Sequence, residues 1–319
     1  MELQTKVKLP NPDFSITHTD SLVSIGSCFS ENIGKKFKYF NFKIHVNPFG
    51  QQYNPLSVAA GIQRLHRNEE YTANDLVYYN ELFQSFDHHS DFSSPHPDEA
   101  LERINTEFRN ASNTLLHADV LFLTLGTAHY FEHVETEKIV SNCHKFPAKT
   151  FRQKLASSKA IVDALNTALI PLLAINPKLK IVFTISPVRY LAFGHFENSV
   201  SKGHLFTAIG ELIANNAAYS YFPAYEIIMD ELRDYRFYAE DMLHPNTIAI
   251  DYVWEKLAQN YFHSNTISIN AEIDSIQKLV NHRPRNNQSI AHQQLLEHCN
   301  KRIAKLKELY NIDFLNTTL

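Results

Sequence analysis

Two short segments far apart in the chain carry the side chains of a nucleophilic site. Ser27 and Cys28 lie in a turn of small residues that follows the apolar run 22–25. Asp241 and His244 stand three residues apart near residue 241. A hydroxyl or thiol nucleophile, an imidazole base and a carboxylate that orients the imidazole are the groups that covalent acyl transfer requires. Together the two segments predict chemistry of this kind.

The turn at residues 26–30 has the local structure that a nucleophile needs. It separates a predicted buried strand from a predicted helix for which Ser30 is the expected N-cap. Ligands of open α/β sheets bind at the carboxyl ends of the strands. A helix N-terminus also favours a thiolate, so we expect a lowered pKa for the Cys28 thiol. The alternative is that Ser27 and Cys28 are small packing residues at a tight turn.

The Asp241–His244 spacing suits a hydrogen bond between the two side chains. Such a bond fixes the imidazole tautomer and stabilises the imidazolium that forms when the nucleophile loses its proton. The same spacing also occurs at helix caps, so it acquires its meaning only together with the turn at Cys28.

Alternating strands and helices must position these side chains. Short apolar runs that end at Gly or Ser-Pro predict strands buried on both faces. Helical spacing of apolar residues predicts the connecting helices, and the alternation predicts an α/β fold, a three-layer α/β/α doubly wound parallel sheet. The predicted strands cover residues 22–25, 120–125 and 181–185, and the predicted helices include 158–176, 199–217 and 246–262.

Composition excludes several classes of partner. The 319 residues carry a net charge of −4, which argues against general nucleic-acid binding. Residues 1–7 lack the apolar core of a signal peptide, and no apolar run reaches the ~18 residues that indicate a membrane span. The three cysteines form no CxxC pair. A reduced, cytoplasmic protein without a metal or cofactor is therefore expected.

We expect the chain to divide into a domain at residues 1–262 and a helical extension at residues 263–319. The extension contains an apolar stripe at 3-4-3-4 spacing. We expect this stripe to pack on the domain or at a homodimer interface. Its members are Leu296, Cys299, Ile303, Leu306 and Tyr310.

The string Gly-Ser-Cys-Phe-Ser at residues 26–30 resembles the signature of the GSCFA-domain family of bacterial proteins, where Ala is more usual than Ser30. This family resembles the SGNH (GDSL-like) hydrolase superfamily, which comprises three-layer α/β/α esterases and acyltransferases. The likeness covers most of the chain. Further matching strings lie at residues 47–50, 53–55, 87–90, 124–128, 142–145, 186–189, 221–223, 233–238 and 241–245.

The resemblance implies a role for each residue of the nucleophilic set. Cys28 takes the position of the usual catalytic serine, and Ser27 takes that of the preceding aspartate. Cys28 is thus the first candidate for the nucleophile, and Ser27 is the second. Asp241 and His244 match the late Asp-x-x-His of the superfamily. Gly50 corresponds to the glycine of the oxyanion hole.

One element of the superfamily pattern is missing. The third-strand block keeps its glycine as Gly126 but lacks the asparagine that donates to the oxyanion, and such a donor contributes ~2.7–4 kcal/mol to lowering the barrier. Asn142, His129 and His144 are the candidates to replace it. A pocket-lining role and a structural role weigh equally for Asn142 and His144.

Arg189, which follows a predicted strand, is suited either to bind a substrate carboxylate or phosphate or to form a solvated salt bridge. The predicted function is that of an ester hydrolase or acyltransferase acting on a small-molecule or glycan acyl ester. The alternative is a non-catalytic module that binds a ligand or carbohydrate and retains the fold. The intact Asp-x-x-His favours the enzyme, whereas the missing asparagine favours the binding module.

Overall fold

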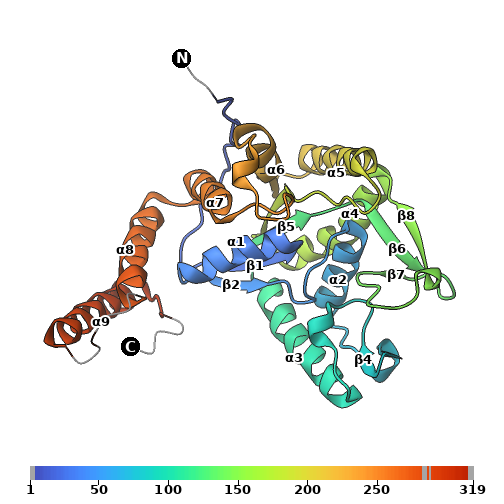
Figure 1. Cartoon of the computed structure of the whole chain (residues 1–319), viewed down its shortest axis with the longest axis horizontal. Helices are drawn as coiled ribbons and strands as arrows, with labels where there is room; N and C mark the ends of the chain where they lie inside the picture. The colour runs from blue at the N-terminus through green and yellow to red at the C-terminus, as the bar shows by residue number, and fades with distance from the viewer. Residues whose placement is uncertain (1–3, 282–285, 287–288, 315–319) are drawn as a thin grey trace.

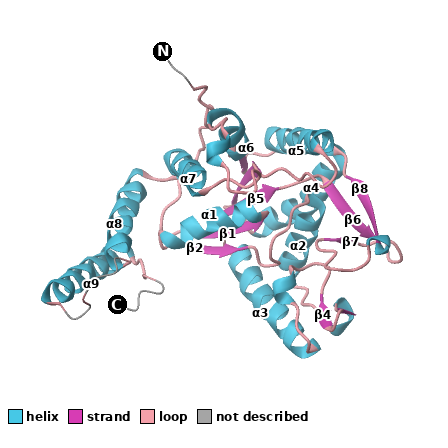
Figure 2. Ribbon diagram, viewed as in Figure 1, coloured by secondary structure: helices cyan, strands magenta, loops and turns pink. Residues whose placement is uncertain are grey.

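A parallel sheet of five strands forms the centre of the computed structural model, which describes residues 4–281, 286 and 289–314. The strand order is β10-β9-β5-β1-β2, and every neighbouring pair is parallel. The three strands predicted from apolar runs are adjacent, which confirms the α/β prediction. Figure 2 shows β1 and β5 side by side, flanked by helices. The strands are β1 (Ser21–Gly26), β2 (Lys43–Val46), β5 (Val120–Leu125), β9 (Lys180–Ile185) and β10 (Tyr219–Tyr221).

The strand order reverses at β1, because the chain adds β2 on one side of β1 and the later strands on the other. Ligands of doubly wound sheets bind at such a switch point. Gly26, the last residue of β1, is paired with Thr124 of β5. Its φ is +151°, and a Cβ atom there would lie 2.2 Å from the Thr124 carbonyl oxygen. Glycine thus allows β1 to end tightly against β5 and to deliver the next residues to the sheet edge.

Helices cover both faces of the sheet and bury two apolar clusters (Figure 1). One face packs against α1 (Cys28–Tyr39), α6 (Ala224–Glu226) and α7 (Thr247–Tyr261). The other packs against α2 (Pro55–Arg67), α3 (Pro97–Leu116), α4 (Ser158–Ile175) and α5 (His195–Asn215). Within the described residues, α4 alone is long and apolar enough by composition to cross a membrane. Its leucines at 165, 169 and 172 are fully buried in the core.

A second, antiparallel sheet lies beside the main one and was not predicted. Its order is β7-β6-β8, with β6 (His129–His133), β7 (Ile139–Val140) and β8 (Phe151–Leu155). It begins four residues after β5, so it borders the carboxyl edge of the central sheet. A two-stranded hairpin, β3 (Val77–Tyr79) with β4 (Leu82–Gln84), lies within the segment between α2 and α3.

The two C-terminal helices, α8 (Ser264–Val280) and α9 (Ile290–Tyr310), pack on each other and extend away from the sheet (Figure 1). The apolar stripe of α9 contacts α8, where Ile303 and Leu306 join Ile273 and Ile276 in a separate cluster. Phe40, at the end of α1, packs against the same cluster and links it to the domain.

Candidate active site

A pocket of about 320 Å³ opens at the carboxyl edge of the central sheet. It unites the residues after β1, β5 and β9 with the loop that precedes α7. Six of the predicted site residues line it, namely Ser27, Cys28, Gly126, His129, Arg189 and His244. The remaining lining residues are Tyr53, Asn54, Thr127, Phe131, Val140, Ser141, Ser186, Val188 and Tyr190.

Asp241 and His244 form the hydrogen-bonded pair that their spacing predicts. Asp241 Oδ2 lies 2.6 Å from His244 Nδ1, and Oδ1 accepts the backbone N–H groups of Leu243 and His244 at 2.9 Å each. These backbone bonds, followed by the imidazole bond, lower the pKa of the Asp241 carboxyl to about 2. The ionised carboxylate places a proton on Nδ1 of His244. Nε2 is then the nitrogen that accepts a proton.

Ser27 and Cys28 occupy different environments although they are neighbours. Ser27 is the N-cap of α1: its Oγ accepts the N–H of Phe29 at 3.3 Å, and the residue is only 1% exposed. Cys28 opens the helix and is half-buried. The prediction that Ser30 is the N-cap is wrong. Ser30 lies inside α1, and its hydroxyl forms a hydrogen bond with the hydroxyl of Ser24. The hydroxyl of Ser27 therefore has a structural task that the thiol does not share.

The thiol of Cys28 does not have the lowered pKa that the helix N-terminus predicts. Burial raises its pKa, and the carboxylate of Glu31 acts in the same direction. Backbone N–H groups of the first turn and the ammonium of Lys202 lower the pKa, but they do not offset the burial. The helix dipole alone predicts a lower pKa, but desolvation of the sulfur is the larger effect and raises it. The Cys28 thiol is thus protonated at neutral pH.

Two family models match the chain: the GSCFA family over residues 21–257, and the GSCFA domain protein, C-terminal domain, over residues 273–317. The chain belongs to the GSCFA family. Among solved structures, a carbohydrate esterase family 3 from Talaromyces cellulolyticus is similar, with 8% identity and a TM-score of 0.32. The likeness covers 79% of this chain and 98% of that chain. No curated protein matches the sequence.

Three residues expected at the oxyanion or substrate lie elsewhere in this GSCFA protein. Gly50 is in a turn with φ +73°, and its N–H donates to the Asn47 carbonyl at 2.8 Å, outside the pocket lining. Asn142 Oδ1 accepts the N–H of His144, and His144 Nε2 lies 2.8 Å from the Ser85 carbonyl. These groups hold the turn after β7 against the segment before α3. The structure therefore does not support an oxyanion role for Gly50, Asn142 or His144.

Lys202 on α5 is the main residue of the site that the sequence analysis missed. It is 2% exposed, and its Nζ donates to the carbonyls of Gly126, Ser186 and Val188 at 2.7, 2.7 and 3.2 Å. All three carbonyls belong to residues that line the GSCFA pocket. Burial lowers the pKa of Lys202 to about 7. Its position three residues before the buried Leu205, on the apolar face of a helix, was a signal that could have identified it.

His129 lines the pocket in a defined tautomer. Gln153 Nε2 donates to His129 Nδ1 at 2.9 Å, so a neutral ring carries its proton on Nε2. That Nε2 is buried and, in the described part of the chain, has no hydrogen-bond partner. Burial also lowers the pKa of His129, which keeps the ring neutral.

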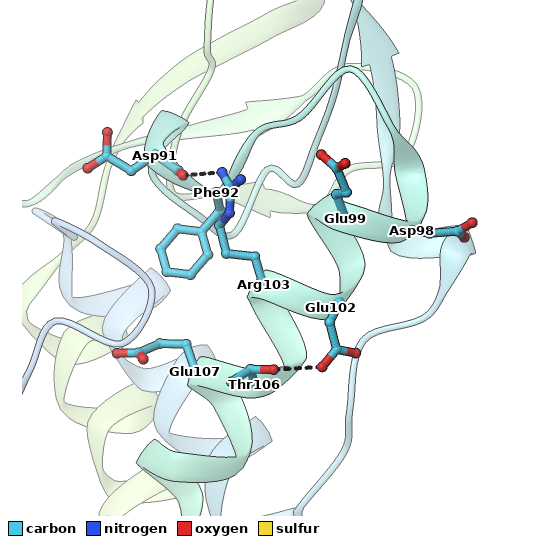
Figure 3. Close-up of a pocket in the computed structure, with 8 residues that line it drawn as sticks. All are labelled: Asp91, Phe92, Asp98, Glu99, Glu102, Arg103, Thr106 and Glu107. Carbon is cyan, nitrogen blue, oxygen red and sulfur yellow. Dashed lines mark hydrogen bonds between the residues drawn. The ribbon is translucent and has the colours of Figure 1, made fainter.

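A larger and more open hollow, of about 780 Å³, lies over α3 and is of a different kind. Its lining residues are Asp91, Phe92, Asp98, Glu99, Glu102, Arg103, Thr106 and Glu107. In Figure 3, Arg103 reaches the Asp91 carbonyl, and Thr106 donates to Glu102. Among the described residues, no group of three His, Cys, Asp or Glu side chains is placed to hold a metal ion, here or elsewhere.

Proposed function

We propose that this GSCFA protein is an ester hydrolase or acyltransferase in which Cys28 is the nucleophile and His244 the general base. The observation that supports this function is the hydrogen bond between His244 Nδ1 and Asp241 Oδ2 at 2.6 Å, in a histidine that lines the same pocket as Cys28. A carboxylate that fixes the tautomer of an imidazole beside a nucleophile is the arrangement of acyl-transfer sites.

The chemistry proceeds in two steps. His244 Nε2 takes the proton of the Cys28 thiol as the sulfur bonds to the carbonyl carbon of the ester. The tetrahedral intermediate then expels the alcohol oxygen, which receives that proton from His244, and a thioester remains on Cys28. Water or a second alcohol attacks the thioester in the same way and releases the acyl group. Because burial raises the pKa of Cys28, the base must act during the attack rather than before it.

Two N–H donors at the pocket are suited to the oxyanion in place of the missing asparagine. The backbone N–H of Cys28 opens α1 and has no acceptor within the helix. Asn54, the N-cap of α2, donates one Nδ2 hydrogen to Ser57 Oγ at 2.9 Å and retains a second hydrogen. These two groups together would supply the stabilisation that acyl transfer requires.

The test is ester turnover by wild-type protein and by His244→Ala. A panel of para-nitrophenyl esters and acetylated sugars should reveal turnover above buffer, and His244→Ala should lower kcat by ~10³-fold or more. His117→Ala is the matched control, because His117 is an exposed histidine at the end of α3. Turnover that His244→Ala retains in full would contradict the proposal. Absence of turnover together with binding of an intact glycan would favour a binding module instead.

A further inference from the structure

The pocket around Cys28 contains a cation that forms no ion pair with an acidic side chain of the described residues. Arg189 is the one Arg or Lys among its lining residues, which include no Asp or Glu within the described chain. Arg189 Nη2 lies 3.4 Å from Met229 Sδ, a weak acceptor. Among the described residues, no carboxylate lies within ion-pair distance of this guanidinium. A half-buried guanidinium with only a thioether partner leaves most of its donors for a ligand.

Two other arginines, Arg233 and Arg236, do have carboxylate partners. Arg233 pairs with Asp230 at 2.8 Å, and Arg236 lies 3.7 Å from Asp234. Both of these side chains are 74% exposed, whereas Arg189 faces the pocket. Among the described residues, the two exposed arginines thus have carboxylate partners, whereas Arg189, which lines the pocket of Cys28, has none within ion-pair distance.

Arg189 also stands between two hollows. It lines the Cys28 pocket and an adjoining hollow of about 280 Å³ that Met242 and Leu243 border. Asp234 also lines this second hollow, and its carboxylate lies 3.7 Å from Arg236. Met242 and Leu243 connect Asp241 to His244, so an anion held by Arg189 would lie beside the loop that carries the base. The guanidinium of Arg189, which has no carboxylate within ion-pair distance among the described residues, thus favours a negative ligand at this end of the pocket.

We propose that Arg189 binds an oxyanion, a carboxylate or a phosphate, carried by the ester substrate near its scissile bond. This inference rests on the proposed function, in which the substrate is an ester, and it adds that the ester is anionic. A planar guanidinium presents paired N–H groups that match both anions.

Binding of uncleaved analogues tests the inference without turnover. The ligands are para-acetamidobenzoate, its neutral methyl ester and para-acetamidophenyl phosphate, titrated by NMR or calorimetry. At least one anion should bind about tenfold or more tightly than the neutral methyl ester, and Arg189→Gln should remove the difference. Arg236→Gln is the control, because it removes the same charge from an exposed arginine of the segment before α7, outside both hollows. The two anions show whether carboxylate or phosphate is preferred.

Equal binding of the anionic and neutral analogues to wild-type protein would overturn the inference, whether or not the variants fold. Turnover of para-acetoxybenzoate and of its methyl ester separates the inference from the proposed function. Turnover of both esters without anion preference would leave the function standing and remove the inference. Anion binding that depends on Arg189, without turnover of any ester, would support the anion site and contradict the function.

Discussion

The hollow over α3 and the pocket of Cys28 differ in the surroundings of their charged side chains. In the hollow over α3, acidic residues outnumber the single Arg103, and all of them except the half-buried Glu107 are exposed; the side-chain exposure of Glu102 is 73%. In the smaller Cys28 pocket, Arg189 has no carboxylate within ion-pair distance among the described residues, and Lys202 is buried behind the floor. Charge on an exposed helix requires little compensation, whereas charge in a confined site has a free-energy cost that a specific partner must offset.

Volume alone would select the hollow over α3, which is more than twice as large. The smaller pocket lies at the switch point of the sheet, and it alone brings together a thiol, a histidine held by a carboxylate and a cation lacking a carboxylate partner. The chemical character of the groups that meet, rather than the size of the space, distinguishes the two regions.

Among substitutions that test this difference between the two regions, Cys28→Ala should have the largest effect. Cys28→Ala should abolish ester turnover, a loss of ~10³-fold or more, because the base then has no nucleophile to activate. Ser27→Ala should retain most of the turnover and lower the free energy of unfolding by ~0.5–2 kcal/mol, since it removes the N-cap of α1. Paired kinetics and urea unfolding of the two variants measure both effects. The reverse pattern would make Ser27 the nucleophile.

A smaller effect is expected at Lys202. Lys202→Met leaves three carbonyl groups at the pocket floor without their donor, so the free energy of unfolding should fall by ~1–3 kcal/mol. The pH dependence should also change. The lysine pKa falls from 10.5 to about 7 on folding, so the unfolded chain binds more protons between these values. Wild-type stability should therefore rise with pH across this window relative to the variant.

Urea midpoints measured from neutral pH toward pH 10 check this difference. Two features of Lys202 have opposite effects on its pKa. Burial disfavours the ammonium form, whereas the three carbonyl acceptors, which match its three N–H groups, favour that form. Parallel profiles for wild type and Lys202→Met would show that the carbonyls prevail and that the ammonium persists above pH 7.

The sequence predicted the frame of the site because its signals are local. Apolar runs placed β1, β5 and β9, and parallel strands necessarily bring their carboxyl ends to one edge. The hydrogen bond between Asp241 and His244 follows from their spacing within one loop. Strand ends and short spacings of this kind depend on few residues and little on tertiary packing.

The rest of the site depends on packing that no local pattern encodes. Gly50 follows β2 as the resemblance requires, but the turn with Asn47 uses its N–H and directs it away from the pocket. Burial of Cys28 under the neighbouring loops reverses the expected direction of its pKa. The second sheet, which brings His129 to the pocket, consists of strands of two to five residues with weak alternation. Lys202 acquires its role only when three strand-end carbonyls converge on it.

The smallest expected effect lies in the hollow over α3. Glu102 accepts a hydrogen bond from Thr106 and faces Arg109 at 3.3 Å on an exposed helix surface. Ion pairs of this kind contribute ~0–1 kcal/mol, so Glu102→Gln should change the free energy of unfolding by less than about 1 kcal/mol. It should leave kcat/KM for every ester within about twofold, because a charge change on a solvated helix does not reach a screened, separate pocket. Steady-state kinetics at low and physiological salt provide the measurement. A tenfold loss that disappears in salt would mean that the acidic hollow steers or binds the substrate, and the division between the two regions would then be wrong.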